Sequence, residues 1–217
     1  MTPAGRASAA MEVLGDLAGR KRPAAAALKD WGLAHRFAGS GDRAAIGSLV
    51  FDCLRKRASL SFAMEDESPR ALVLRALASD WQMSPEAIEA LCDGSRFAPA
   101  PLSPAERDGL ARAVGSDAPS FIQGDYPAWL EDAFTALFGE GAADQGAALS
   151  VRAPVDLRVN TLKANASGFA IGSSDCVLAS AIPVPSSRSI SVLIQLLLSL
   201  LRRDATTRAH STPSKPS

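Results

Sequence analysis

The sequence has 217 residues, of which 47% are hydrophobic, and it carries equal numbers of basic and acidic side chains, 23 of each. This length allows one large or two small domains with an apolar core, and the charge balance excludes a uniformly basic nucleic-acid binder. The charges are nevertheless segregated along the chain. Residues 1–60 carry ten basic and five acidic side chains, residues 61–150 carry five and fifteen, and residues 151–217 carry eight and three. The basic ends are compatible with anionic ligands and equally with solvated helix faces that differ in charge.

Cysteine and histidine usage argues against a metal site. Cys53, Cys92 and Cys176 are far apart and form no Cys-x-x-Cys pair, and the only histidines are His35 and His210. This spacing matches no metal-ligand pattern. Cys53 and Cys92 lie in apolar helical patterns and are expected to be buried. We therefore expect no bound metal. Because the N-terminus has no apolar signal-peptide region, we also expect a reduced, cytoplasmic protein.

Helical patterns follow one another through the first 150 residues, which we expect to form an all-helical bundle. A first helix is expected over residues 7–18. A second begins at Pro23, which suits a first helical turn, and runs through an alanine-rich stretch to residue 37. The side chains expected to make its apolar contacts are Leu28, Trp31, Leu33 and Phe37.

The clearest helical pattern is GDRAAIGSLVFDCLRKR, residues 41–57. Asp42 can cap this helix, which is expected to end near Arg57. Apolar residues recur at the spacing of one helix face: Ile46, Leu49, Val50, Cys53 and Leu54. The basic run Arg55-Lys56-Arg57 suits the negative end of a helix dipole and, as an alternative interpretation, the binding of phosphate.

Further helices are expected over residues 69–81, 84–94 and 127–138. Between the last two, Ser103 and Glu106 form a capping box with proline at the first helical position. The apolar side chains expected to pack the helix over 127–138 are Trp129, Leu130, Phe134, Leu137 and Phe138.

A stretch of alternating polarity, VDLRVNTLKA, follows at residues 155–164. Its apolar positions have the period of a half-buried strand, which we expect over residues 155–160. The next residues could turn helical, so the stretch has the form of a strand that leads into a larger α/β unit.

Two parts of the sequence resemble known families. DRAAIGSLVFDCLRKR (42–57) is similar to the third-helix region of NusB-like helical domains. YPAWLEDAFTALFG (126–139), followed by RAPVDLRVNTLKA (152–164), resembles the start of the catalytic part of the RsmB/NOP (Fmu/Sun) family. Members of that family are S-adenosylmethionine-dependent RNA cytosine methyltransferases.

The resemblance implies a mainly α fold with three regions. Residues 1–125 would be a NusB-like helical RNA-binding domain. Residues 126–164 would be linker helices and the first strand of the methyltransferase N-terminal subdomain. A Rossmann-like catalytic core would follow in a complete family member.

The chemistry of that family is missing from this sequence. The family needs an Ala-Pro-Gly-Gly loop and an acidic residue for the cofactor, and two cysteines in Pro-Cys and Thr-Cys motifs, one of which attacks carbon 6 of cytosine. Cys176 has neither flank and no basic neighbour that would lower its pKa, and Gly168 and Gly172 are too sparse for a cofactor loop. We therefore expect no catalytic residue and no cofactor-binding residue in this chain, although the full-length family uses S-adenosylmethionine.

Residues 165–217 have a different composition, with twelve serines and only two acidic residues. ISVLIQLLLSLL (190–201) predicts a helix with one narrow polar stripe, too short to span a bilayer but able to lie on a membrane surface or bind a partner. The last residues, 204–217, have a composition typical of disorder. A change of reading frame would explain this tail, and the alternative is a genuine short form with an added amphipathic helix.

These features support two functional hypotheses. In the first, the chain is the N-terminal RNA-binding portion of an rRNA (cytosine, carbon 5) methyltransferase, inactive as it stands. In the second, it is a stand-alone NusB-like RNA-binding module without an enzymatic role. A purely structural helical protein with solvated charges remains the third interpretation. The residues expected to contact RNA are Arg20, Lys21, Arg22, Arg55, Lys56, Arg57, Arg158 and Asn160.

Overall fold

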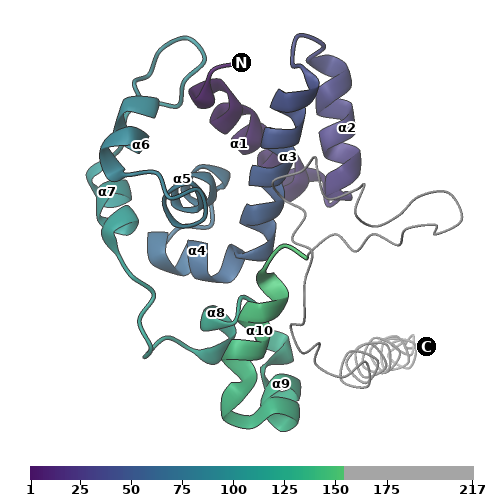
Figure 1. Ribbon diagram of the computed structural model, residues 1–217, viewed down its shortest axis with the longest axis vertical. Helices are drawn as coiled ribbons and strands as arrows, with labels where there is room; N and C mark the ends of the chain where they lie inside the picture. Colours follow the sequence, from purple (N-terminus) through teal and green to yellow (C-terminus); the bar gives the residue numbers. More distant parts are fainter. Residues whose placement is uncertain (154–217) are drawn as a thin grey trace, which may run out of the picture. The chain divides into compact units, whose positions relative to one another are not determined.

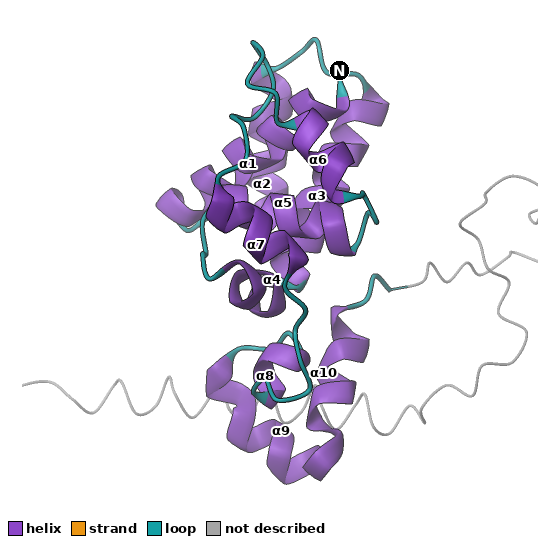
Figure 2. Cartoon of the chain, turned by 90° about the vertical axis from the view of Figure 1, so that its left-hand side faces the viewer, coloured by secondary structure: helices purple, strands orange, loops and turns teal. Residues whose placement is uncertain are grey.

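A computed structural model describes residues 1–153, in which every regular element is a helix (Figures 1 and 2). The expectation of a mainly helical protein is confirmed for this part of the chain. The predicted strand at 155–160, the predicted helix at 190–201 and the rest of residues 154–217 lie outside the described residues.

The described residues form ten α-helices and two short 3-10 helices. In chain order these are α1 (Pro3–Arg20), α2 (Ala24–Ala34), α3 (Ser40–Arg55), α4 (Arg57–Met64), α5 (Pro69–Ser79), α6 (Pro85–Leu91), α7 (Pro104–Ala111), α8 (Ser120–Gln123), η1 (Ala128–Leu130), α9 (Glu131–Phe138), η2 (Gly139–Gly141) and α10 (Ala142–Ser150). The sequence patterns did not predict α4, α8 and α10. Only Lys56 separates α4 from α3, whereas α8 and α10 are too short for a recurring apolar stripe.

Serine side chains begin three of the helices, as their positions before proline suggest. The hydroxyls of Ser68, Ser84 and Ser103 each accept a hydrogen bond from the backbone N–H three residues later, and a proline follows each serine. The predicted capping box is confirmed: Glu106 N–H donates to Ser103 Oγ at 3.2 Å, and Ser103 N–H donates to Glu106 Oε2 at 2.8 Å.

Helix α5 forms the centre of the bundle and contacts α1, α3, α4, α6 and α7 (Figure 1). A helix enclosed in this way must be apolar on most of its circumference. Its buried residues are Ala71, Leu72, Val73, Leu74, Ala76 and Leu77. The predicted stripe of α3 faces the same core through Ile46, Leu49, Val50 and Cys53, whereas Leu54 is 39% exposed.

Helices α8, α9 and α10 form a separate layer of the unit, with α8 in contact with α4 (Figure 2). The ring of Tyr126 stacks on that of Phe134 with 4.2 Å between centroids, and the Tyr126 hydroxyl donates to Glu131 at 2.8 Å. Burial and the adjacent Glu131 carboxylate raise the pKa of Tyr126 to about 12. Leu130 is buried with them. Tyr126, Leu130 and Phe134 therefore form the apolar centre of this layer.

Several apolar side chains that the sequence patterns assigned to helix contacts lie on the surface instead. Trp129 and Leu137 are 63% and 41% exposed. In the second helix, Leu33 is 56% exposed and Phe37 lies beyond the helix end at 72% exposed. The sequence patterns predict apolar contacts for these side chains, but they are largely exposed, because the second helix ends earlier or the helices present another face to their neighbours.

Asp125 joins the two layers by capping α4 from 66 residues away. Its carboxylate accepts from the Ser59 N–H and from the Ser59 hydroxyl, both at 2.8 Å. We expect Asp125→Ala to lower the free energy of unfolding by about 1 to 2 kcal/mol, the usual cost of a lost helix cap. Asp125→Asn is the matched control, since its amide oxygen still accepts and asparagine tolerates the positive φ of 53° at this position. Urea denaturation followed by circular dichroism measures both variants, and equal loss in both would contradict the capping role.

The pH dependence of the same contact has a defined sign. Burial raises the pKa of the Asp125 carboxyl above its ordinary value, with the hydrogen bonds from Ser59 opposing that rise. The stability that this group contributes is therefore full below the ordinary aspartate pKa and declines as the pH rises through the raised value. The Asp125→Asn variant should lack this part of the decline above the ordinary aspartate pKa when its unfolding is compared with that of the unchanged protein.

Candidate nucleic-acid interface

The basic run at the end of α1 is largely engaged by carboxylates. Arg20 lies 3.0 Å from Asp16, and Arg22 lies 2.5 Å from Asp16 and 2.7 Å from Asp30. Asp30 and Asp16 together raise the pKa of Arg22. Lys21 differs from its neighbours, because it ends α1 in the left-handed conformation and has no ion pair with a described carboxylate.

The second basic run, at the junction of α3 and α4, is engaged in the same way. Each side chain has its own acidic partner: Arg55 pairs with Asp52, Lys56 with Asp80, and Arg57 with Glu67 at 3.0 Å. A phosphate that binds either run must displace these carboxylates. The prediction that the two runs contact RNA stays a prediction, and Arg158 and Asn160 lie outside the described residues.

Other basic side chains of residues 1–153 form no ion pair with a described carboxylate. Besides Lys21, they are Lys29, Arg36, Arg43, Arg75, Arg96 and Arg152. The Arg75 guanidinium is not available to a ligand, because it donates hydrogen bonds to the backbone carbonyls of Leu110 and Arg112, both at 2.9 Å. Arg36 and Arg96 are exposed, and each precedes an exposed phenylalanine in the sequence.

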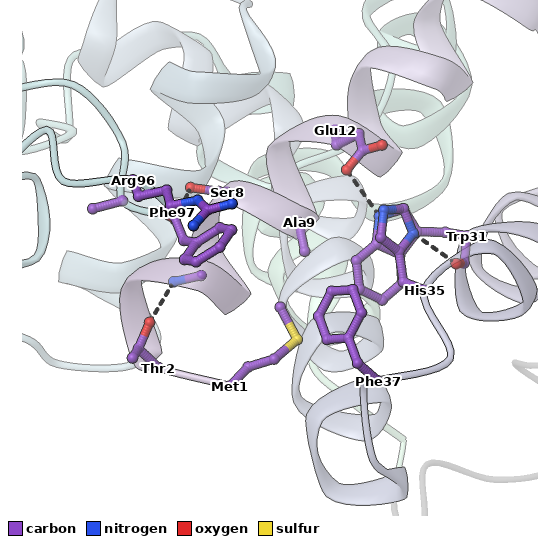
Figure 3. Close-up of a pocket in the computed structure, with 12 residues that line it drawn as sticks. Met1, Thr2, Ser8, Ala9, Glu12, Trp31, His35, Phe37, Arg96 and Phe97 are labelled. Atoms are coloured by element: carbon purple, nitrogen blue, oxygen red, sulfur yellow. Dashed lines mark hydrogen bonds between the residues drawn. The ribbon is translucent and has the colours of Figure 1, made fainter.

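Those two phenylalanines, Phe37 and Phe97, line a pocket of about 750 Å³, here called the aromatic pocket (Figure 3). It draws on three segments of the chain: the N-terminus with α1, the end of α2 with the turn after it, and the loop between α6 and α7. Its lining residues are Met1, Thr2, Gly5, Ser8, Ala9, Glu12, Trp31, His35, Phe37, Arg96, Phe97 and Ala98.

One wall of the aromatic pocket is a series of three rings. Trp31 and His35 stack with 4.3 Å between centroids, and Phe37 meets the edge of His35 at 5.7 Å. The His35 ring is held by a 2.9 Å contact between Nδ1 and the Trp31 carbonyl. Trp31 Nε1 donates to the Glu12 carboxylate at 2.9 Å, which ties this wall to α1. The outermost ring, Phe37, is 72% exposed.

The opposite wall consists of Phe97 and Arg96. The Arg96 guanidinium carbon lies 5.1 Å from the centre of the Phe97 ring, within the range of a cation–π contact. The Ser8 hydroxyl donates to the Phe97 carbonyl at 3.0 Å and fixes the loop on α1. Phe97 is 67% exposed. Figure 3 shows Met1 between Phe97 and Phe37, and Ala9 between Phe97 and the rings of Trp31 and His35.

The sequence patterns missed the aromatic pocket because it is assembled from distant segments. The sequence pattern predicts a helix contact for Phe37, whereas Phe97 begins a proline-rich stretch, FAPAPLSP at residues 97–104. The one local signal was the spacing of Trp31 and His35, since side chains four residues apart lie on the same face of a helix. Nothing in the sequence indicates that Phe97 lies opposite them.

A second pocket, of about 700 Å³, lies among α4, α5, α8 and α10. Its charged members are already engaged within the protein: Lys56 with Asp80, Arg75 with backbone carbonyls, and Asp125 with Ser59. This pocket therefore offers no charged group that is available to a ligand.

The described residues contain no arrangement suited to catalysis by cysteine or metal. Burial raises the pKa of Cys53 to about 12 and also raises that of Cys92, so neither thiol is an activated nucleophile. Both cysteines are buried, as predicted. No group of His, Cys, Asp and Glu side chains in residues 1–153 is placed to hold a metal ion, and no helix in this part of the chain is long and apolar enough to cross a membrane.

No family model matches the sequence, and neither the curated proteins nor the solved structures give a match.

Proposed function

We propose that residues 1–153 form an RNA-binding domain, with ribosomal RNA as its target. The observation that carries the proposal is the aromatic pocket, in which the exposed rings of Phe37 and Phe97 adjoin Arg96, a basic side chain that has no ion pair with a described carboxylate. Proteins that bind single-stranded RNA combine these two elements: bases stack on the rings, and cations contact the phosphates. Arg96, which lines the pocket, and Arg36, which is exposed and precedes Phe37 in the sequence, are the proposed phosphate contacts.

We further propose that this domain is the front portion of an S-adenosylmethionine-dependent RNA cytosine methyltransferase. The support is the resemblance of residues 126–139 and 152–164 to the RsmB/NOP family, in which a NusB-like helical domain precedes the catalytic part. Residues 126–131 begin the first of these stretches, and Tyr126 and Leu130 within them are buried. Because the cofactor loop and both cysteine motifs are missing from the sequence, the chain is proposed to be inactive by itself.

A stand-alone RNA-binding module is the second candidate, and it is favoured by the same missing motifs. A methylation assay on ribosomal RNA with labelled S-adenosylmethionine separates catalysis from binding. We expect RNA binding without methyl transfer, and measurable turnover would overturn the proposal that this chain is inactive.

The salt dependence of RNA affinity tests the proposed function. Counterion release predicts that affinity for a 12-nucleotide single-stranded RNA falls steeply between about 50 and 200 mM salt. Neutralising Arg36 and Arg96 together, as Arg36→Gln and Arg96→Gln, should reduce the slope of log affinity against log salt by about 1.4, since each single-strand phosphate contact contributes about 0.7. Fluorescence anisotropy with a labelled RNA measures this slope.

The matched control neutralises two exposed arginines that already have acidic partners. Arg57→Gln and Arg107→Gln break ion pairs with Glu67 and Glu89, so we expect a nearly unchanged slope. If the control pair changes the slope more than the Arg36 and Arg96 pair does, the phosphate contacts lie instead in the basic run that includes Arg57. Absent or salt-insensitive RNA binding would contradict the proposed function altogether.

A further inference from the structure

We infer that the aromatic pocket holds one unpaired base of single-stranded RNA and prefers a base with an exocyclic amino group. The inference rests on the proposed RNA binding and assigns to it a base-reading site. It follows from the shape of the pocket, from the position of its charges and from the hydrogen-bonding capacity of Glu12.

The floor of the aromatic pocket is one face of α1 with small side chains. Gly5, Ser8, Ala9 and Glu12 are spaced by three or four residues and therefore lie on the same side of the helix. Met1 lies over Gly5, where a Cβ atom would be 3.7 Å from Met1 Cε. The small side chains of Ser8 and Ala9 continue the floor from there toward Glu12. Figure 3 shows Ala9 between the two walls and Glu12 near Trp31. A planar group can enter between the walls and reach the Glu12 carboxylate.

The two walls offer ring faces to such a group. Phe37 and Phe97 are among the most exposed apolar side chains of the described residues, although Trp31 beside them is only 9% exposed. Covering two exposed rings with a base removes apolar surface from water. The Trp31–His35 stack holds two rings, and the bond from Ser8 holds the backbone of Phe97, which limits the ordering needed when a base binds.

The charges at the aromatic pocket match a nucleotide better than an uncharged aromatic ligand. Arg96 lies over the Phe97 ring and has no ion pair with a described carboxylate, so it is available to a phosphate at the edge of the pocket. Glu12 lies at the Trp31 wall. A nucleotide carries an anionic group and a hydrogen-bond-donating base edge, and this arrangement complements both. An aromatic side chain of a protein would leave Arg96 without a complement.

Glu12 supplies the base preference. One of its carboxylate oxygens accepts from Trp31 Nε1, and a carboxylate has further lone pairs that accept additional hydrogen bonds. An exocyclic amino group, as on cytosine, adenine or guanine, donates to such an acceptor. Uracil instead presents carbonyl oxygens on both sides of its N3–H, and these repel a carboxylate. The pocket should therefore prefer the amino-bearing pyrimidine over uracil.

Matched oligonucleotides test the inference with the full chain. We expect 10-nucleotide oligo(C) to bind on the order of fivefold more tightly than oligo(U) at 100 mM salt, measured by fluorescence anisotropy. Phe97→Ala and Phe37→Ala should each weaken oligo(C) binding about tenfold through lost stacking. Phe62→Ala on α4 is the control, because this ring is also exposed, at 42%, but lies outside the pocket. Circular dichroism confirms that each variant is folded.

Glu12→Gln tests the reading of the base edge. Its amide oxygen still accepts from Trp31, whereas its amide nitrogen becomes a donor that suits a uracil carbonyl. The preference for oligo(C) should therefore fall to about one or reverse, with total affinity for RNA retained. A purely structural role of Glu12 would lower both affinities together and leave their ratio unchanged.

The outcomes separate the inference from the proposed function. If both oligonucleotides bind with the expected salt dependence but the three pocket variants behave like Phe62→Ala, the base pocket is overturned and RNA binding stands. If neither binds at low salt, both fail. A titration of the unchanged protein with CMP, UMP and N-acetyltryptophan amide, followed by NMR of the His35 ring, provides a readout without variants. A response to the tryptophan analogue alone would overturn the inference in favour of a protein partner.

Discussion

Leu74→Ala is expected to lower the free energy of unfolding by about 2 to 5 kcal/mol, the largest effect of any single change considered for this protein. Leu74 is fully buried in α5, the helix that contacts five others. Removing its branched end leaves a cavity that the surrounding helices cannot close without moving together. Since folded domains have only about 5 to 15 kcal/mol of stability, this loss is a large part of the total.

Urea denaturation followed by circular dichroism measures the effect, and Leu33→Ala is the control. Leu33→Ala is the same substitution on α2, but Leu33 is 56% exposed, so we expect the free energy of unfolding to change by at most about 0.5 kcal/mol. Similar losses for Leu74→Ala and Leu33→Ala would contradict the central position of α5.

Gly146→Ala should have the second-largest effect on stability, about 1 to 3 kcal/mol of destabilisation. A Cβ atom at Gly146 would lie 2.5 Å from Tyr126 Cδ1 and 2.6 Å from the Gly124 carbonyl oxygen. The second of these atoms belongs to the backbone, so α10 must move away from the end of α8. Alanine normally stabilises a helix relative to glycine by about 1 kcal/mol, which makes a net loss diagnostic of this close approach.

The control for Gly146→Ala is Gly141→Ala. A Cβ atom at Gly141 meets nothing within 4 Å, and this residue has a negative φ of −80° that alanine adopts readily. We expect it to be neutral or slightly stabilising. Thermal unfolding followed by circular dichroism compares the two variants. A stabilising Gly146→Ala would show that the two helices do not approach closely.

The candidate site shows where sequence reasoning succeeds and where it stops. The basic runs at residues 20–22 and 55–57 are conspicuous in the sequence, yet all of these side chains except Lys21 have carboxylate partners. Three of these partners, Asp30, Glu67 and Asp80, lie eight or more positions along the sequence from the basic residue they pair with, so no local sequence pattern predicts the pairs. The aromatic pocket is the reverse case. No sequence pattern marks Phe97 as a functional residue, and its role is indicated only by its position in the pocket with Phe37 and Arg96.

The helices that depend on local chemistry were predictable from the residues. Serine before proline places a cap and a first turn together, and the apolar stripe of α3 follows the helical period, so α5, α6, α7 and the core-facing side of α3 could be read directly. Both cysteines of the described part were also placed correctly in the core. These features arise from interactions within a few residues of each other.

The remaining features require the packing of distant segments. Helix α4 is capped by Asp125, 66 residues later in the chain, and α10 lies against α8 because Gly124 and Gly146 have no side chain in the way. The exposure of Trp129, Leu33 and Phe37 follows from which face each segment turns to its neighbours. Hydrophobicity marks a side chain as able to be buried, but the partner surface must come from elsewhere in the fold. For that reason the helical character of the chain was evident in its residues, whereas the carboxylate partners of its cations and the walls of its pocket became visible only when the helices were assembled.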